Sequence, residues 1–335
     1  MGSKLFKIYS ECQYFLHTYW RSEGLAEKTL SIMGAGIASY YVLKNTMRLI
    51  NYLRPIPFSL SYRYGSGSWV VITGATSPLG RAFAYEFARK GFSLCLLGRS
   101  QEKMETLKQE IREINHSINI KIIAVDFQQC LAPNFFTSII EEIKNLDISI
   151  LINNASVDFF DYFTEATSQQ LRELFCVNMV AVVMLTNIII KKMLIRRFNS
   201  AVINISSCEG VFPSAFSSIY SASKAFIDAF SIELGKEFGD KIDILALRPY
   251  WIRTELFPFI KKLLYVSAEN CVKACLGQIS KGYTTYGPPK HAILAVGKEV
   301  LPSWMRNMGS KITKPLSIEE KRKVYMRFEK RRRYI

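Results

Sequence analysis

Six short apolar runs recur between residues 69 and 247, and a segment of helical periodicity separates each run from the next. The runs are rich in valine, isoleucine and leucine and lack the regular polar alternation of a half-buried strand. Such runs are typical of parallel strands that helices cover on both faces. We therefore expect an α/β fold with a doubly wound parallel sheet and right-handed crossovers. The expected strands are 69–73, 93–98, 121–125, 148–152, 201–205 and 244–247, and the expected helices are 81–91, 101–114, 135–144, 168–195 and 217–237.

The chain before the first strand contains an uncharged run over residues 29–43. A transmembrane helix needs about 20 apolar residues, so this run of 15, which includes Ser, Gly and Thr, predicts a short membrane anchor or an interfacial helix. A soluble amphipathic helix is the alternative. Four basic residues and no acid follow within residues 44–63, which predicts that the larger C-terminal part faces the cytosol. Prolines and glycines predict a linker over 51–68, so we expect an extension over 1–64 and a main domain over 65–304.

The net charge of +16 is concentrated in the last segment, residues 305–335, where eleven Lys and Arg face three Glu. Such a basic tail can bind anionic lipid, a polyanion such as coenzyme A or nucleic acid, or it can simply be solvated. Nucleic-acid binding ranks last, because the tail is its only support. The seven cysteines form no CxxC pair, and none of the three histidines lies in a segment of catalytic character. We expect reduced thiols, no metal site and no Ser-His-Asp hydrolase.

Several candidate cofactor residues stand at successive strand ends, as in dinucleotide-binding folds of the Rossmann type. The turn TGATSPLG follows the first strand and opens a helix, where backbone N–H groups can hold a pyrophosphate. Pro78 replaces a glycine there; it suits the first helical position, although we expect it to weaken cofactor binding. Arg99 stands where an NAD-binding fold places an acid, which favours NADPH, unless it is only a surface cation. The expected cofactor residues are Gly74, Thr76, Ser77, Leu79, Gly80, Arg99 and Ser100, with Asp126 and Phe127 at the adenine end and Asn153, Asn154 and Ala155 after the fourth strand.

The candidate catalytic residues are Asn178, Ser207, Tyr220 and Lys224. Tyr220 and Lys224 are four residues apart, so they share one face of a helix. A nearby ammonium stabilises a phenolate, and we expect Lys224 to lower the pKa of Tyr220 toward neutrality and to bind the cofactor's ribose. Ser207 is expected to hydrogen-bond a substrate carbonyl, and Asn178 to hold a water that links Lys224 to solvent. The alternative for any such Tyr–Lys pair is an ordinary surface pair.

The segments TGATSPLG, LINNAS, NISS, YSASK and RPYWIRT resemble, in order and spacing, the fingerprints of the short-chain dehydrogenase/reductase family. The resemblance implies a Rossmann-type fold and a catalytic tetrad formed by the four residues just named. It also implies that Tyr220 and Lys224 contact the cofactor, and that Pro249, Ile252 and Thr254 enclose its nicotinamide. The chain departs from the family pattern at Pro78 and at Ser156.

The stretches NISSCEGVFPSAFSSIYSASKAF, SAENCVKAC and LPSW are similar to the membrane-bound branch of 17β-hydroxysteroid dehydrogenases and very-long-chain 3-oxoacyl-CoA reductases. This similarity implies NADPH-dependent reduction of a lipid ketone, either a 3-oxoacyl-CoA or a steroid-like lipid, at the endoplasmic reticulum membrane. It also implies a substrate lid at about 255–300. A membrane-associated scaffold or lipid-binding protein with weakened catalysis is the alternative. The apolar run 177–190 is a candidate homodimer face, or it is buried by the chain's own loops.

Overall fold

The computed structural model describes residues 10–11, 13–14, 24–54, 56–252 and 266–300. These residues divide into two units, Met1–Arg54 and Pro55–Ile335, which are described separately. Thr254, part of the expected lid and the basic tail lie outside the described residues.

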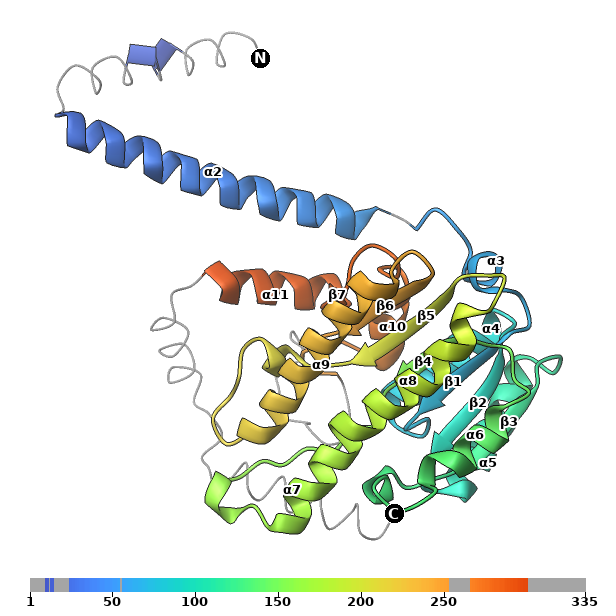
Figure 1. The fold of residues 1–335 in the computed structure, drawn as a ribbon. Helices are drawn as coiled ribbons and strands as arrows, with labels where there is room; N and C mark the ends of the chain where they lie inside the picture. The colour runs from blue at the N-terminus through green and yellow to red at the C-terminus, as the bar shows by residue number, and fades with distance from the viewer. Residues whose placement is uncertain (1–9, 12, 15–23, 55, 253–265, 301–335) are drawn as a thin grey trace. The chain divides into compact units, whose positions relative to one another are not determined.

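A parallel sheet of seven strands forms the centre of the second unit, in the order β3-β2-β1-β4-β5-β6-β7 (Figure 1). The order reverses between β1 and β4, and the crevice at such a switch point is where doubly wound sheets bind ligands. The six expected strands are confirmed to within two residues at each end. Their bounds are β1 Trp69–Thr73, β2 Ser93–Gly98, β3 Ile120–Ala124, β4 Ile148–Asn153, β5 Ser200–Ile205 and β6 Ile242–Leu247. The seventh, β7 (Thr284–Thr285), was not expected, because two residues carry no periodicity.

The helices begin at the residues that their capping chemistry favours. Ser100 and Thr167 accept hydrogen bonds from backbone N–H groups in the first turns of α5 and α7. The long helix expected over 168–195 contains one π-helical turn, η3, which separates α7 from α8. The helices of the domain are α4 Pro78–Arg89, α5 Gln101–Ile114, α6 Phe135–Ile143, α7 Ser168–Phe175, η3 Cys176–Val180, α8 Ala181–Leu194, α9 Ser218–Phe238, α10 Ala268–Leu276 and α11 Pro289–Val300, with shorter 3₁₀ turns η1 Phe127–Gln129, η2 Phe163–Glu165 and η4 Cys208–Gly210.

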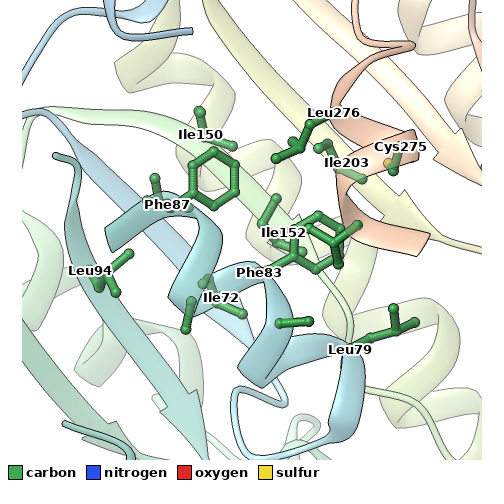
Figure 2. Close-up of a cluster of buried hydrophobic side chains, with 14 of the residues drawn as sticks. Ile72, Leu79, Phe83, Phe87, Leu94, Ile150, Ile152, Ile203, Cys275 and Leu276 are labelled. Atoms are coloured by element: carbon green, nitrogen blue, oxygen red, sulfur yellow. The ribbon is translucent and has the colours of Figure 1, made fainter. Parts of the chain in front are cut away.

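Two hydrophobic cores cover the two faces of the sheet. Alternate residues of a strand point to opposite faces, so Val70 and Ile72 join the core beneath α4, α5 and α10, whereas Val71 joins the core beneath α6, α7 and α8. In Figure 2, Phe83 and Phe87 of α4 lie over the sheet beside α10. Removal of a buried phenylalanine side chain typically costs about 3–5 kcal/mol.

Two stretches differ from their expected roles. The expected lid includes α10, but four residues of α10 are buried, Cys271, Val272, Cys275 and Leu276, so this helix is part of the core. The apolar run 177–190 also lies mainly in the core, although Met184 is 42% exposed. This burial matches the alternative that we considered for the run, and a homodimer stays a prediction.

The expected linker contains a short helix, α3 (Leu60–Tyr64), that packs on the domain. The Tyr64 hydroxyl donates a hydrogen bond to Asp243 Oδ2 at 2.7 Å, and Arg63 forms two hydrogen bonds with the same carboxylate. The compact unit therefore begins at Pro55, earlier than the boundary at residue 65 that the sequence suggested. A turn-rich sequence did not reveal this helix, because its partner, Asp243, is distant in the chain.

The first unit contains one long helix, α2 (Leu25–Leu53), which includes the uncharged run 29–43. Large apolar side chains along α2, including Leu30, Ile37 and Leu43, are exposed. Among the described helices, one segment, Ser168–Leu194, has the length and hydropathy of a membrane span, and 56% of its apolar window is buried inside the domain. That segment consists of α7, η3 and α8, so it is a core helix, and the anchor at 29–43 stays a prediction.

Candidate active site

Two glycines shape the turn between β1 and α4. Gly74 adopts a left-handed conformation with φ +62°, and a Cβ atom there would lie 2.9 Å from Ala155 Cα. A Cβ atom on Gly80 would lie only 2.4 Å from the Gly74 carbonyl oxygen. Side chains at these positions would collide with backbone atoms of the loop after β4 and of the turn itself, so the two glycines let these segments pack closely against each other.

The start of α4 is built as expected around Pro78. Ser77 is the N-cap and accepts a hydrogen bond from Gly80 N–H at 3.1 Å, and Pro78 occupies the first helical position. Its missing N–H therefore removes no hydrogen bond within the helix. Of the other expected residues in this turn, Thr76 is half-buried and Leu79 is buried in the core.

Asn154 joins the ends of β1 and β4. Its Nδ2 group donates hydrogen bonds to the Thr73 and Gly74 carbonyls, both at 2.9 Å, and lies 3.0 Å from Ser77 Oγ. Thr73 Oγ1 in turn accepts from the backbone N–H groups of Asn154 and Ala155. These contacts fix the turn at a helix N-terminus, where the partial positive charge favours a phosphate. The residues present therefore fit the pyrophosphate of a dinucleotide.

The other candidate cofactor residues divide into exposed and structural groups. Arg99 is exposed at the end of β2, with no ion-pair partner in the described part of the domain, and Ser100 caps α5. Asp126 caps η1 through a hydrogen bond from Gln128 N–H, and the Phe127 ring packs on Phe135 in the core.

Asn153 has a structural role in the sheet. Its Nδ2 group donates to Thr186 Oγ1 at 2.9 Å and to Asn204 Oδ1 at 2.8 Å, so it links β4 to α8 and β5. The side chain therefore points toward its neighbours within the fold. Contact with the cofactor through this side chain, which we expected, stays a prediction.

The four candidate catalytic residues come together beside the end of β5. Lys224 is buried, and its Nζ atom donates to the Ile205 carbonyl at 2.9 Å and lies 5.4 Å from the centre of the Tyr220 ring. Tyr220 is half-buried, and Ser207, which precedes η4, lies close enough for its hydroxyl to act on the pKa of the phenol. The spacing of Tyr220 and Lys224 on α9 thus places both beside Ser207, and a simple surface pair is excluded because Lys224 is only 3% exposed.

Asn178 lies in the π-helical turn and is fully engaged by protein groups. Its Nδ2 atom donates to the Val157 carbonyl at 2.8 Å and to Ser223 Oγ at 3.1 Å. Its Oδ1 atom accepts from Val157 N–H and from the Ser156 hydroxyl. An amide has two donor hydrogens and two acceptor sites, so the Asn178 side chain is fully used in fastening the loop after β4 to α9. The water that we expected Asn178 to hold stays a prediction.

The electrostatics of Tyr220 correct the sequence prediction. Burial raises the pKa of Tyr220, the carboxylates of Asp158 and Glu209 raise it further, and the hydrogen bond from Ser207 opposes them. We had expected Lys224 to lower this pKa. Burial also lowers the pKa of Lys224, to about 8, while Asp228 and Asp158 act in the opposite direction. Tyr220 consequently keeps its proton at neutral pH, as a proton donor must.

Charged residues that the sequence analysis missed support the tetrad. Glu209 Oε2 accepts hydrogen bonds from the hydroxyls of Ser217 and Ser221, which join η4 to α9. Asp228 forms a buried ion pair with Arg248 at 3.0 Å, and burial raises the pKa of this carboxyl. A charged residue within an apolar stretch, such as Asp228 in SKAFIDAF, is the only sequence signal that could have identified it.

The sheet edge beyond β6 supplies the other side of the site. The Pro249 carbonyl accepts a hydrogen bond from Cys208 N–H at 3.0 Å, and Ile252 forms an isolated bridge with Val266. The Lys298 Nζ atom of α11 lies over the rings of Phe212 and Tyr250, at 5.5 and 5.1 Å. Helix α11 therefore lies beside the segments that follow η4 and β6, and its role as part of a lid stays a prediction.

A family model for the short chain dehydrogenases matches residues 68–262. The chain therefore belongs to the short-chain dehydrogenase family, and it is an oxidoreductase that acts on CH–OH and C=O groups.

Within this family the chain is similar to two kinds of curated relative. It is 31% identical to the very-long-chain 3-oxoacyl-CoA reductase of Bos taurus over 284 residues, which cover 82% of this chain and 88% of the relative. It is 34% identical to the 17-beta-hydroxysteroid dehydrogenase type 3 of Mus musculus, with 72% and 79% of the two chains covered. These relatives match the branch that the sequence motifs indicated.

Solved structures share the fold. A 7beta-hydroxysteroid dehydrogenase superposes with a TM-score of 0.68 at 23% identity, over 76% of this chain and all of that one. A short-chain dehydrogenase from Sphingobium yanoikuyae in complex with NADPH gives 0.60 at 24% identity, over 70% of this chain and 97% of that one.

Proposed function

We propose that this protein reduces the ketone of a hydrophobic lipid with NADPH, either the 3-oxo group of a long-chain acyl-CoA or a 17-ketosteroid-like group. The observation that carries the proposal is the position of the buried Lys224 ammonium between the Ile205 carbonyl and the Tyr220 ring, beside Ser207. The names of the relatives support both substrate classes.

The residues of the tetrad divide the chemistry among them. When bound, the reduced nicotinamide supplies the hydride. Ser207 and Tyr220 hydrogen-bond the ketone oxygen, and Tyr220 donates the proton that completes the alcohol. Lys224 places its positive charge beside the phenol, where it stabilises the phenolate that proton transfer leaves. Asn178 keeps the loop after β4 in place against α9.

The choice of NADPH rests on Arg99. This exposed cation follows β2 at the position where an acid would bind a ribose 2′-hydroxyl, and a guanidinium there can pair with a 2′-phosphate. The complex of the Sphingobium yanoikuyae relative with NADPH supports the same choice.

We also propose that the protein associates with the endoplasmic reticulum membrane, with its catalytic domain in the cytosol. Helix α2 supports this location, because its 29 residues carry exposed apolar side chains. The basic residues that follow the run 29–43 favour the cytosolic orientation of the domain.

A reductase assay on the full-length protein tests the proposal. The loss of NADPH absorbance is measured with a long-chain 3-oxoacyl-CoA and with a 17-ketosteroid, and Tyr220→Phe serves as the matched variant. We expect one substrate class to be reduced, and Tyr220→Phe to lower turnover by about 100-fold or more while NADPH binding is retained. Full activity of Tyr220→Phe would show that the mechanism is wrong. NADPH binding without reduction of either substrate would show that the proposed substrates are wrong.

A further inference from the structure

Exposed apolar side chains gather at the end of the sheet where the strands begin, away from the candidate active site. Leu194, Ile195 and Phe198, at the end of α8 and in the loop before β5, are 41%, 87% and 47% exposed. Tyr62 of α3 is 81% exposed. The patch lies at the end of the sheet where the parallel strands begin, whereas the tetrad lies at the end where they finish. The two sites are therefore at opposite ends of the strands. We call these four residues the edge patch.

The two halves of the edge patch are packed together and held rigidly. Arg196 Nη2 donates a hydrogen bond to the Tyr64 carbonyl at 2.8 Å, and the same guanidinium forms two hydrogen bonds with Asp147. A Cβ atom on Gly65 would lie 3.2 Å from the Phe198 ring, which shows how closely this ring approaches the end of α3. Figure 1 shows α3 beside the C-terminal end of α8. The exposed apolar residues therefore belong to one fixed surface.

Two exposed cations lie beside the apolar side chains in the chain. Arg197 lies between Ile195 and Phe198 in the chain, and Lys191 lies on the last turn of α8. Both are exposed, and neither side chain has an ion-pair partner among the residues that the structure describes. Asp147, which contacts this segment, is paired with Arg196. Such a surface is complementary to an anionic bilayer, because apolar side chains can insert among the lipids while neighbouring cations bind the anionic headgroups.

An open cavity in the same region adds to this character. It has a volume of about 330 Å³ and is lined by apolar residues of the segment 56–61 and by the C-terminal ends of α4 and α10. Two serines, Glu86, Lys90 and Lys273 also line it. Lys90 and Arg89 both pair with Glu86, whereas Lys273 has no acidic partner within the described part of the chain. The cavity thus combines apolar side chains with one unpaired cation, Lys273.

The chain itself limits how far the edge patch can lie from α2. Helix α2 ends at Leu53 and α3 begins at Leu60. The six residues between them can extend over about 20 Å at most. This short connection limits the separation between the C-terminal end of α2 and the start of α3, which carries Tyr62 of the edge patch.

We propose that the edge patch docks on an anionic lipid bilayer, with Ile195 and Phe198 inserted among the headgroups and Arg197 on lipid phosphates. The inference rests on the membrane association proposed above and adds which surface of the domain meets the bilayer. In this orientation the C-terminal ends of the strands, where we expect the cofactor to bind, face the aqueous phase.

An environment-sensitive fluorophore tests this orientation. The full-length variant Ile195→Cys is labelled with a nitrobenzoxadiazole probe and bound to vesicles of phosphatidylcholine with phosphatidylserine. The matched control is Leu131→Cys, because Leu131 is also exposed, at 66%, but follows β3 at the opposite edge. The unsubstituted chain, labelled in parallel, gives the background from native thiols. We expect a blue shift of emission at position 195 and none at position 131.

Further arms separate the possible outcomes. The shift at position 195 should be lost on pure phosphatidylcholine vesicles or when Arg197→Glu is added. Vesicle flotation of the same samples measures membrane association independently, and the reductase assay measures the proposed activity. Equal emission at positions 195 and 131 in protein that floats with vesicles would overturn the orientation alone. A shift that follows protein concentration without vesicles would also overturn it, and would indicate contact with a second copy.

Discussion

Substitution of Gly80 by alanine tests whether the turn between β1 and α4 must be closely packed. Gly80 is the third residue of α4, and its backbone is helical. Helix propensity alone predicts that alanine stabilises such a position by about 1 kcal/mol. The structure predicts the opposite sign, because the added Cβ atom would lie 2.4 Å from the Gly74 carbonyl oxygen and 2.9 Å from Ala75 Cα.

The magnitude follows from those contacts. Cβ atoms essentially never lie closer than 3.0 Å to non-bonded atoms of other residues, so the turn has to move by several tenths of an ångström. Overpacking costs about 1–3 kcal/mol, and a contact as short as 2.4 Å belongs at the upper end of that range. After the propensity gain we expect a net loss of up to about 2 kcal/mol, or up to roughly 8 °C in Tm for a domain of this size. NADPH affinity should fall at least tenfold, which corresponds to about 1.4 kcal/mol.

Thermal unfolding and NADPH fluorescence titration measure the two effects. Gly297→Ala is the matched control, because Gly297 lies within α11 and a Cβ atom there would meet nothing within 4 Å. This control should be neutral or slightly stabilising and should bind NADPH normally. If Gly80→Ala is as stable as Gly297→Ala and binds NADPH equally well, the close approach of the turn is not required and our account of the cofactor cradle is refuted.

Three further predictions concern other parts of the molecule. Lys224→Met should raise the free energy of unfolding, and the gain should be about 3 kcal/mol larger below pH 8 than above pH 10.5. The reason is that burial lowers the pKa of Lys224 from 10.5 to about 8, so between these pH values the unfolded chain binds a proton that the folded chain does not. Urea unfolding across pH measures this, and a gain that does not change with pH would contradict it. Arg99→Glu should weaken NADPH binding at least tenfold while NADH binding is retained or improved, since a carboxylate repels the 2′-phosphate; titrations with both cofactors decide, and unchanged NADPH affinity would remove Arg99 from the site. Tyr64→Phe should destabilise the domain by about 1.5–3 kcal/mol, because its hydroxyl donates to the Asp243 carboxylate; urea unfolding with Tyr62→Phe as the exposed control measures the difference, and equal stability of the two variants would show that the bond contributes nothing.

The strands and the catalytic spacing could be predicted from the sequence because both are local. Runs such as WVVIT indicate a buried strand without reference to the rest of the chain, and a spacing of four residues places Tyr220 and Lys224 on one helix face. The N-cap at Ser77 and the position of Pro78 also follow from neighbouring residues.

The remainder depended on contacts between distant residues. Helix α3 is held by Asp243, and no pattern within residues 60–64 reveals that partner. The pKa of Tyr220 was expected to fall because only Lys224 was considered, whereas burial and Asp158 dominate in the folded protein. The partners of the Asn178 amide were not predicted for the same reason, because Val157 and Ser223 become its neighbours only through folding.

The hydrogen bonds from Ser217 and Ser221 to Glu209 have a consequence for how this enzyme can be altered. They close a loop over residues 210–216 whose two ends are fastened to the catalytic elements, and a Cβ atom on Gly210 would lie 2.8 Å from the Lys224 backbone. The first position of the loop therefore tolerates no side chain, while residues 213–215 are exposed and make none of these contacts. The loop thus has fixed ends and an exposed middle. Exchanging residues 213–215 between homologues should leave the geometry of the proton-donating residues unchanged.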